Sequence, residues 1–249
     1  MKKFLIVIVT LVVVLAAGLF GYVKVKSKPL PSGESGPAAE ALANEMLGAI
    51  NHDAWLKTGA IRWNFGGRQN HLWDRERHLA KVEWENIQVL INLSTREGVV
   101  YQAGQELTQG KEEYLEQAWA HWANDSFWLN PISKVFDDGT SRQLITMEDG
   151  LRGLLITYSS GGVTPGDSYL WVVDNSGLPV RFDMWVSIIP IDGFEASWEG
   201  WTTLDTGVKV SQKHDLSIFQ LELTDIKAAA TLAELEGGHD PFAALFTNP

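Results

Sequence analysis

Residues 168–187 read SYLWVVDNSGLPVRFDMWVS, two apolar stretches joined by the turn-forming run Asn175-Ser176-Gly177. Asn and Ser side chains can hydrogen bond to nearby backbone, and Gly tolerates the left-handed backbone that many turns need. On both sides of this run, large apolar residues recur at every second position, which is the period of a β-strand with one buried face. The stretch therefore predicts a β-hairpin. The alternating residues are Tyr169, Trp171 and Val173, then Phe182, Met184 and Val186.

Short strands separated by turn signals extend outward from this hairpin through most of the chain. Asp149-Gly150 and Gly161-Gly162 are two such signals, each between apolar stretches. Many short strands with hairpin connections are typical of an antiparallel meander that curls into a barrel or half-barrel. The predicted strands are 61–65, 71–76, 78–84, 87–93 and 98–103, and then 142–147, 152–158, 168–174, 179–187, 194–203, 207–213 and 217–224.

Two stretches instead show the period of a helix. In residues 38–52 and 111–125, apolar residues recur every three or four positions. With the strands, they predict one α+β domain over residues 38–226, in which a strongly curved antiparallel sheet (a half-barrel) packs against helices. We expect residues 227–249 to form a tail with a short helix and a loose end.

The N-terminus carries a long apolar run. Residues 4–23 hold no charge, and Lys2 and Lys3 precede them. A helix of this length spans about 30 Å, the thickness of a bilayer core. A positive start followed by an apolar run fits both a cleaved signal segment and an anchor, but the apolar core of a signal peptide is usually only about 7–15 residues. For residues 1–28 we therefore favour an uncleaved anchor over a signal segment, with residues 4–23 as the transmembrane helix.

The orientation of this span is not decided by charge, because lysines lie on both sides of it. A short tail ahead of a long folded body suits an exported body. The expected location is the inner (plasma) membrane, single-pass, with the body in the periplasm or extracellular space. Residues 29–37, PLPSGESGP, predict a flexible tether, because Pro, Gly and Ser disfavour regular structure.

The charge balance argues against nucleic acid as a partner. The chain has 31 acidic and 20 basic residues, a net charge of −11. Because some of the lysines flank the apolar run, the body is more acidic still and repels phosphate backbones. The sequence has no cysteine, which excludes disulfides, thiolate metal sites, a cysteine nucleophile and a lipid-bearing cysteine. The lysines around the run are Lys2, Lys3, Lys24, Lys26 and Lys28.

Catalytic and metal motifs are not found in the sequence. The six histidines do not pair with other ligands at metal-binding spacing, and neither Gly-x-Ser-x-Gly nor Ser-x-x-Lys occurs. The glycine-rich residues 161–167 are not followed by the lysine of a phosphate loop and fit a long hairpin turn. We therefore predict a protein that is not an enzyme and that has no catalytic residues, metal site or cofactor.

Aromatic and other apolar residues are the remaining candidates for a binding site. In a closed small barrel these rows would fill the core, whereas in an open, cupped sheet they would line a concave apolar surface. The helix predicted over 111–125 could cover that surface with its tryptophans. The candidate ligand-binding residues are Trp63, Phe65, Trp73, Trp119, Trp122, Tyr169, Trp171, Phe182 and Met184.

The order of elements resembles the periplasmic lipoprotein-carrier superfamily, the LolA/LolB and LppX-like fold, over about residues 38–226. The similar segments are LWDRERHL at 72–79, LINLSTREGVVY at 90–101 and GDSYLWVVDNSGLPV at 166–180. The resemblance implies a curved sheet whose inner face binds acyl chains. It also places the family's strand arginine on Arg75 or Arg77, as a polar candidate, although the proline that follows it in the family is missing here.

These observations lead to one functional hypothesis and its rivals. We expect a non-catalytic, membrane-anchored binding protein for a lipid, acyl chain or acylated protein such as a lipoprotein. The first alternative is an interaction module of a cell-envelope complex, with an envelope protein as partner and the aromatics forming a filled core. The second is a hydrolase or glycan-active enzyme with an unfamiliar site, which a cluster of strongly shifted carboxylates in one cleft would favour.

Overall fold

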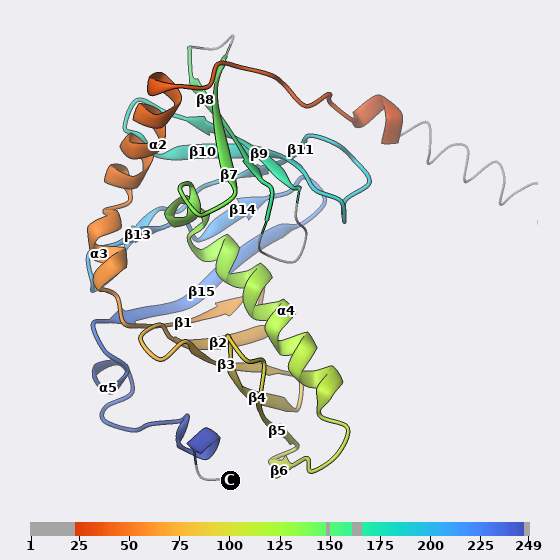
Figure 1. Cartoon of the computed structure of the whole chain (residues 1–249), viewed down its shortest axis with the longest axis vertical. Coiled ribbons are helices and arrows are strands. Elements are labelled where there is room, and N and C mark those ends of the chain that lie inside the picture. Colours follow the sequence, from red (N-terminus) through yellow and green to blue (C-terminus); the bar gives the residue numbers. More distant parts are fainter. Residues whose placement is uncertain (1–22, 148–149, 161–165, 247–249) are drawn as a thin grey trace, which may run out of the picture.

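The computed structural model of this chain describes residues 23–147, 150–160 and 166–246, and its body is built from two large antiparallel sheets (Figure 1). One has five strands in the order β11-β10-β9-β8-β7, and the other has eight in the order β14-β15-β1-β2-β3-β4-β5-β6. A small sheet pairs β12 with β13. The predicted α+β class with curved antiparallel sheets is confirmed.

The five-stranded sheet contains the hairpin predicted from residues 168–187. Trp171 of β9 lies opposite Phe182 of β10, and Tyr169 lies opposite Met184. In the turn, the Asp174 carboxylate accepts hydrogen bonds from the Ser176 amide (2.8 Å) and hydroxyl (2.7 Å). The strands are β7 (Thr140–Thr146), β8 (Arg152–Tyr158), β9 (Ser168–Val173), β10 (Pro179–Trp185) and β11 (Phe194–Ser197).

The eight-stranded sheet joins the two ends of the domain. Its last strand in sequence pairs with its first, and Ala229 lies opposite Ala60. The strands are β1 (Ala60–Phe65), β2 (Gln69–Asp74), β3 (Leu79–Trp84), β4 (Ile87–Asn92), β5 (Gly98–Gln102), β6 (Gln105–Glu106), β14 (Lys213–Asp215) and β15 (Gln220–Ala229).

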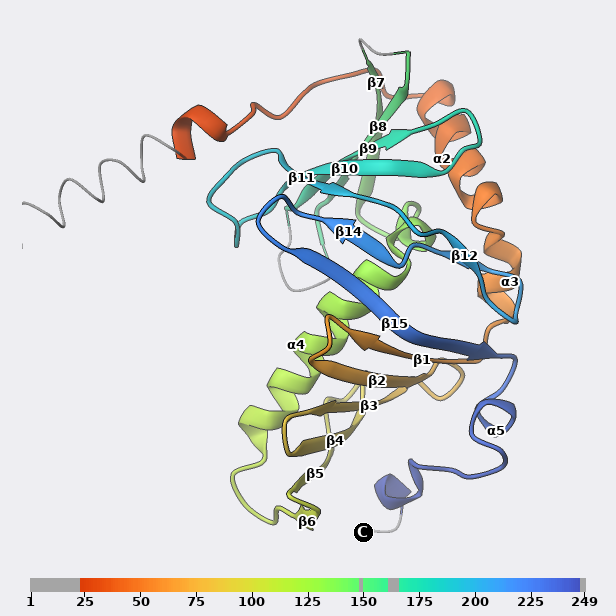
Figure 2. The same ribbon diagram turned by 180° about the vertical axis from the view of Figure 1, so that it is seen from behind.

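The two sheets meet where β11 approaches β14. Glu199 and Lys213 exchange backbone hydrogen bonds in both directions (2.9 and 3.1 Å), and the Ser197 hydroxyl accepts from the Asp215 amide (2.8 Å). The strands therefore follow one another from β7 to β6 as a single curved surface (Figures 1 and 2). The curvature places strands of both sheets around one helix.

That helix is α4 (Glu112–Leu129), which packs on β3, β4 and β5. Its last residue is Leu129, and Asn130 follows as the non-helical C-cap before Pro131, because the residue preceding a proline disfavours helical backbone. α2 (Pro37–Ala49) covers β7 and β8. The helix expected over 38–52 is interrupted: Asn51 is left-handed (φ 57°), which asparagine tolerates, and a separate helix α3 (His52–Lys57) follows.

The strand predicted over residues 194–203 is also divided. β11 stops at Ser197, and the chain turns through Gly200, whose φ of 64° lies in the left-handed region. It resumes as β12 (Thr202–Thr203), which pairs with β13 (Lys209–Val210). A glycine inside a strand-like pattern often marks such an irregularity.

The C-terminal residues pack on the outer face of the eight-stranded sheet instead of forming the expected loose end. α5 (Leu232–Leu235) provides the expected short helix, and η2 (Ala243–Phe246) is a turn of 3-10 helix. Phe242 is fully buried, and Arg77 binds the Asp240 carboxylate through both terminal nitrogens (2.8 and 2.9 Å). The tail is thus a folded part of the domain.

The segment before α2 runs along the five-stranded sheet. Glu34 forms a β-bridge with Leu144, and the Gly33 amide donates to the Gln143 side chain (2.8 Å). Residues 29–37, expected as a tether, are thus attached at these points. The predicted span, residues 4–23, lies outside the described residues except for Val23. Within the described ranges, none of the helices is both long and apolar enough to cross a membrane.

Candidate functional site

A cavity of about 920 Å³ lies between the C-terminal half of α4 and the curved sheet. Strands β9 and β10 form one wall, and the β1–β2 turn and the β14–β15 turn form another. The connection from η1 (Pro131–Lys134) to β7 closes a further side. The volume lies near the upper end of the range for small-molecule pockets, which is about 300–1,000 Å³.

Aromatic and aliphatic side chains cover much of this wall. Phe127 of α4 stands over Tyr169 with ring centroids 5.0 Å apart, and Tyr169 in turn contacts Tyr158 (5.9 Å). Such a wall offers an apolar ligand contact area without requiring hydrogen bonds from it. The other apolar lining residues include Phe65, Trp128, Met184, Val186, Leu216 and Leu221.

The structure separates the nine predicted ligand-binding candidates into three groups. Phe65, Tyr169 and Met184 line the cavity. Three others, which share faces with them along the same strands, are at most 2% exposed and belong to the core that α2 and the end of α4 cover. The last three pack between α4 and the eight-stranded sheet, away from the cavity. The second group is Trp63, Trp171 and Phe182, and the third is Trp73, Trp119 and Trp122.

The two arginine candidates have other partners. Arg75 stacks on Trp55, with its guanidinium carbon 4.1 Å from the ring centre, and donates to the backbone carbonyls of Trp55 and Thr58. Burial lowers the pKa of Arg75 to about 10. Arg77 binds Asp74 (2.6 Å) and Asp240 of the tail. Neither arginine belongs to the wall of the cavity.

The polar part of the wall was not identified from the sequence. Four aspartates line it, against one arginine and one lysine. Lys134 is paired with Asp137 at 2.6 Å. Lys134 is the last residue of η1, and Asp137 and Asp138 follow in the loop before β7, where the sequence shows only the turn-forming run Asp137-Asp138-Gly139. The six residues are Arg68, Asp125, Lys134, Asp137, Asp138 and Asp167.

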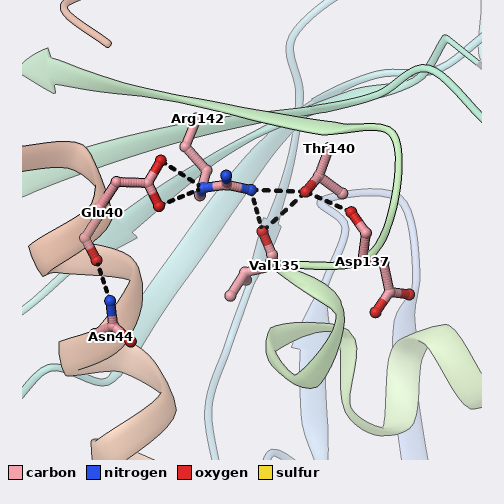
Figure 3. Close-up of polar contacts among 6 residues, drawn as sticks. All are labelled: Glu40, Asn44, Val135, Asp137, Thr140 and Arg142. Carbon is pink, nitrogen blue, oxygen red and sulfur yellow. Dashed lines mark hydrogen bonds and ion pairs between the residues drawn. The ribbon is translucent and has the colours of Figure 1, made fainter. Parts of the chain in front are cut away.

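Arg142 of β7 holds this loop in place (Figure 3). Its Nε donates to both carboxylate oxygens of Glu40 on α2 (3.0 and 2.9 Å), and its Nη1 donates to the Val135 carbonyl (2.8 Å) and the Thr140 hydroxyl (2.7 Å). The Thr140 hydroxyl donates to the Asp137 carbonyl (2.8 Å). One guanidinium therefore fixes the path of the acidic loop relative to α2 and the sheet.

A buried pair fixes α4 across the eight-stranded sheet. His71 Nε2 of β2 lies 2.6 Å from Asp125 Oδ2 of α4, and both side chains are at most 3% exposed. The His71 ring stacks on Trp63, with centroids 4.5 Å apart. Asn124 donates to the second Asp125 oxygen (2.9 Å). Because Asp125 also lines the cavity, this pair sets the position of the helical wall.

A second buried histidine makes stability sensitive to acid. His214 is 1% exposed, packs against Trp198 (4.3 Å) and Trp128 (5.1 Å), and its Nδ1 donates to the Ser197 carbonyl (3.0 Å). Burial lowers its pKa to about 4.

We expect the free energy of unfolding to fall as the pH drops from about 6.5 to about 4, because the unfolded chain, with an ordinary histidine pKa of about 6.5, then binds more protons than the folded one. His214 can contribute a slope of up to about 1.4 kcal/mol per pH unit. Urea unfolding at a series of pH values measures this slope. The variant His214→Phe should flatten it, and an unchanged slope would contradict the assignment.

Groups of three or more His, Cys, Asp or Glu side chains that could hold a metal ion do not occur in the described ranges.

The Tyr169 hydroxyl is hydrogen bonded to Asp167. Burial, together with the nearby Asp167 charge, raises the pKa of Tyr169.

Several solved structures are distantly similar to this chain, among them the following two. A DUF1329 family protein from Desulfovibrio piger matches with a TM-score of 0.44 and 11% identity, over 81% of this chain and 97% of that one. A putative outer membrane lipoprotein-sorting protein domain from Vibrio parahaemolyticus matches with a TM-score of 0.33 and 6% identity, over 78% and 96%. Neither likeness is close enough to transfer a function. No family model and no curated protein matches the chain.

Proposed function

We propose that this protein binds an acyl chain, from a lipid or an acylated protein, in the cavity between α4 and the curved sheet, without catalysing a reaction on it. The observation that supports the proposal most directly is the cavity of about 920 Å³ with a largely aromatic and aliphatic wall. Pockets of this kind are the usual binding sites for apolar ligands. In this proposal, residues 4–23 anchor the chain in the inner membrane, and the body lies in the periplasm or extracellular space.

The position of the cavity mouth supports an anchored role. Ile188 and Phe219 line the cavity yet are 70% and 54% exposed, and Ile218 beside them is 77% exposed. The Lys28 amide donates to the Asp192 carbonyl (2.8 Å), which ties the N-terminal segment to the loop that carries Ile188. Both ribbon views place this segment, the β10–β11 loop and the β14–β15 turn on the same side (Figures 1 and 2).

The connection to the anchor is short. Lys28 lies only five positions after Val23, and a fully extended chain over five positions covers no more than about 17 Å. An anchor ending at residue 23 would hold the β10–β11 loop close to the bilayer surface. The exposed apolar side chains at the mouth would then face the membrane that contains the ligand, and an acyl chain could enter with little exposure to water.

The proposal is tested on the full-length protein released gently from its own membrane. Native mass spectrometry with lipid extraction should find a co-purifying acyl lipid or acylated peptide. Val186→Trp should reduce this occupancy, because the larger side chain fills the cavity. Val180→Trp is the matched control, since Val180 belongs to β10, is exposed and does not line the cavity. Circular dichroism would verify that both variants fold.

Absence of any bound lipid would oppose the proposal. A protein that carries no lipid, and that also ignores added fatty acids and acylglycerols, does not use the cavity for acyl chains. A stable envelope partner in a pull-down, lost when Ile188 and Ile218 are replaced by Ser, would then favour the interaction module. The exposed side chains at the mouth are the observation that would support that reading.

A further inference from the structure

A second cavity lies on the face of the eight-stranded sheet that points away from α4. Its volume is about 590 Å³, inside the range of about 300–1,000 Å³ that small-molecule pockets cover. Successive side chains of a strand point to opposite faces, so Asn70, which lines this cavity, points away from the side of His71, which is buried against α4. This cavity, which we call the polar groove, has its floor on β2 to β5 and its rim on two hairpin turns. It shares no lining residue with the first cavity.

The floor of the polar groove is one row of polar side chains. The row crosses the neighbouring strands β2, β3, β4 and β5 in register, as Asn70, Glu83, Gln88 and Tyr101. Because neighbouring strands lie about 4.8 Å apart, a hydrogen-bonding side chain recurs at that interval. The C-terminal tail packs on the apolar part of this face and on Tyr101, but it leaves the row itself exposed or half-buried.

Two hairpin turns form the rim of the groove at one end of the sheet. Glu85 and Asn86 lie between β3 and β4, and Ala103 and Gly104 lie between β5 and β6. The Ala103 amide donates to the Asn86 carbonyl (2.8 Å), which joins the two turns. Because backbone contacts already hold this rim, a ligand that binds here orders few further groups, and the entropy cost of binding is low.

The side chains in the groove retain free hydrogen-bonding capacity. Within the ranges that the structure describes, neither the Gln88 amide nor the Tyr101 hydroxyl has a protein partner, and the same holds for the Glu85 carboxylate and the Asn86 amide. Amides and phenols both donate and accept hydrogen bonds, and carboxylates accept them. A matching ligand carries several groups that can do both, as the hydroxyls of a sugar do.

Charge and limited apolar area narrow the class of ligand further. None of the described residues that line the groove is basic, and Lys81, on the same face of β3, is paired with Glu83 (3.4 Å). A carboxylate, sulfate or phosphate in the groove would be repelled by Glu83 and Glu85. The aliphatic lining is limited to Ile87 and Ala103, so an apolar chain would bury little area there.

We propose that the polar groove is a second binding site and that its ligand is an uncharged oligosaccharide. The Asn86 and Gln88 amides and the Glu85 carboxylate hydrogen bond to sugar hydroxyls, and Tyr101 provides an aromatic contact for the apolar face of a sugar ring. This inference goes beyond the acyl-binding function and does not depend on it, because the two cavities lie on opposite faces of the sheet. Both sites can be occupied at the same time.

The test uses the full-length protein in a phosphatidylcholine nanodisc. The protein is applied to an array of linear oligosaccharides of glucose, galactose, mannose, N-acetylglucosamine and galacturonic acid. The uncharged trisaccharide that binds best is then titrated by isothermal calorimetry, with trigalacturonate as the anionic comparison. We expect the uncharged trisaccharide to saturate a single site per chain. Trigalacturonate should bind at least about 10-fold more weakly, because the glutamates of the groove repel it.

Matched variants assign the binding to the groove. Gln88→Ala and Asn86→Ala should each lower affinity for the uncharged trisaccharide about 2- to 10-fold, the range expected for the loss of one neutral hydrogen bond. Glu85→Gln should raise affinity for trigalacturonate about 2- to 5-fold, the size expected when one partly screened charge is removed. Gln117→Ala and Glu116→Gln should change neither affinity, since both residues are exposed on α4 and line neither cavity. Circular dichroism would verify that the variants fold.

Three other results would count against this inference. If no uncharged oligosaccharide on the array binds, the groove is not a saccharide site. If an uncharged trisaccharide binds but neither Gln88→Ala nor Asn86→Ala weakens it, the sugar occupies another surface and the assignment of the groove is overturned. Binding of trigalacturonate as tight as that of the uncharged trisaccharide would overturn the ligand class. Absence of a co-purifying lipid would overturn only the acyl-binding function and leave the saccharide site intact.

Discussion

Replacing Trp171 by alanine should lower the free energy of unfolding by about 3–5 kcal/mol, the cost typical of removing a large buried aromatic side chain. Trp171 is fully buried, and its ring centroid lies 5.0 Å from those of both Phe182 and Trp198. Its removal leaves a hole that these neighbours cannot fill without leaving favourable rotamers. Urea unfolding followed by circular dichroism measures the loss.

Tyr169→Ala is the informative comparison, because Tyr169 lies two positions earlier on the same face of β9. One side of Tyr169 borders the cavity, so fewer packing contacts are lost, and we expect a smaller loss of stability together with a change in ligand affinity. Trp171→Ala should reduce stability far more than Tyr169→Ala. A cost below about 1 kcal/mol for Trp171→Ala, well under the range for such substitutions, would show that Trp171 is not a core residue.

Asp125→Ala should have an effect of similar size, about 3–5 kcal/mol, because it removes one member of a buried pair and leaves the other without its partner. His71 Nε2 lies 2.6 Å from Asp125, and the His71 side chain is fully buried. Denaturant unfolding of the single variants His71→Phe and Asp125→Leu and of the double variant that combines them gives the coupling free energy between the two sites. The apolar double variant should be less destabilised than Asp125→Ala, since it buries no unpaired polar group.

Glu222→Ala provides the control for this pair. It removes the exposed ion pair between Lys213 and Glu222 (3.6 Å), which should cost no more than about 1 kcal/mol. If Asp125→Ala were as mild as Glu222→Ala, the buried pair would not hold α4 against the sheet. Loss of acyl binding in Asp125→Ala without loss of stability would instead indicate that Asp125 acts on the ligand.

The hairpin over residues 168–187 was predictable because its pairing depends on local turn chemistry and a period of two. Periodicity assigns a side chain to a face of the sheet but does not show what covers that face at each point. Tyr169 and Trp171 share a face, yet one lines the cavity and the other is core, because α2 and the end of α4 cover only part of β9. Core and cavity residues can therefore be told apart only when the positions of α2 and α4 over the sheet are known.

The polar part of the cavity depends on contacts between distant parts of the chain. His71 and Asp125 lie 54 positions apart, and Arg142 reaches Glu40 across 102 positions. Neither pair forms a local motif. Arg75 and Arg77 were selected through the family resemblance, but here one is held among the tryptophans and the other attaches the C-terminal tail. Tyr158 alternates with Leu154 and Ile156 in the sequence, but the burial of its side chain depends on the packing around it.

The pairing of β15 with β1 also constrains when the domain can form. Ala60 leaves the ribosome long before its partner Ala229 exists, and at a synthesis rate of about 5–20 residues per second the delay is on the order of ten seconds or more. During that interval one edge of β1 has no neighbour and can pair with another chain. Folding must therefore wait for the final tenth of the polypeptide. A truncation within residues 220–229 should yield an aggregation-prone chain, and a factor that shields nascent strands would have its greatest effect before β15 is complete.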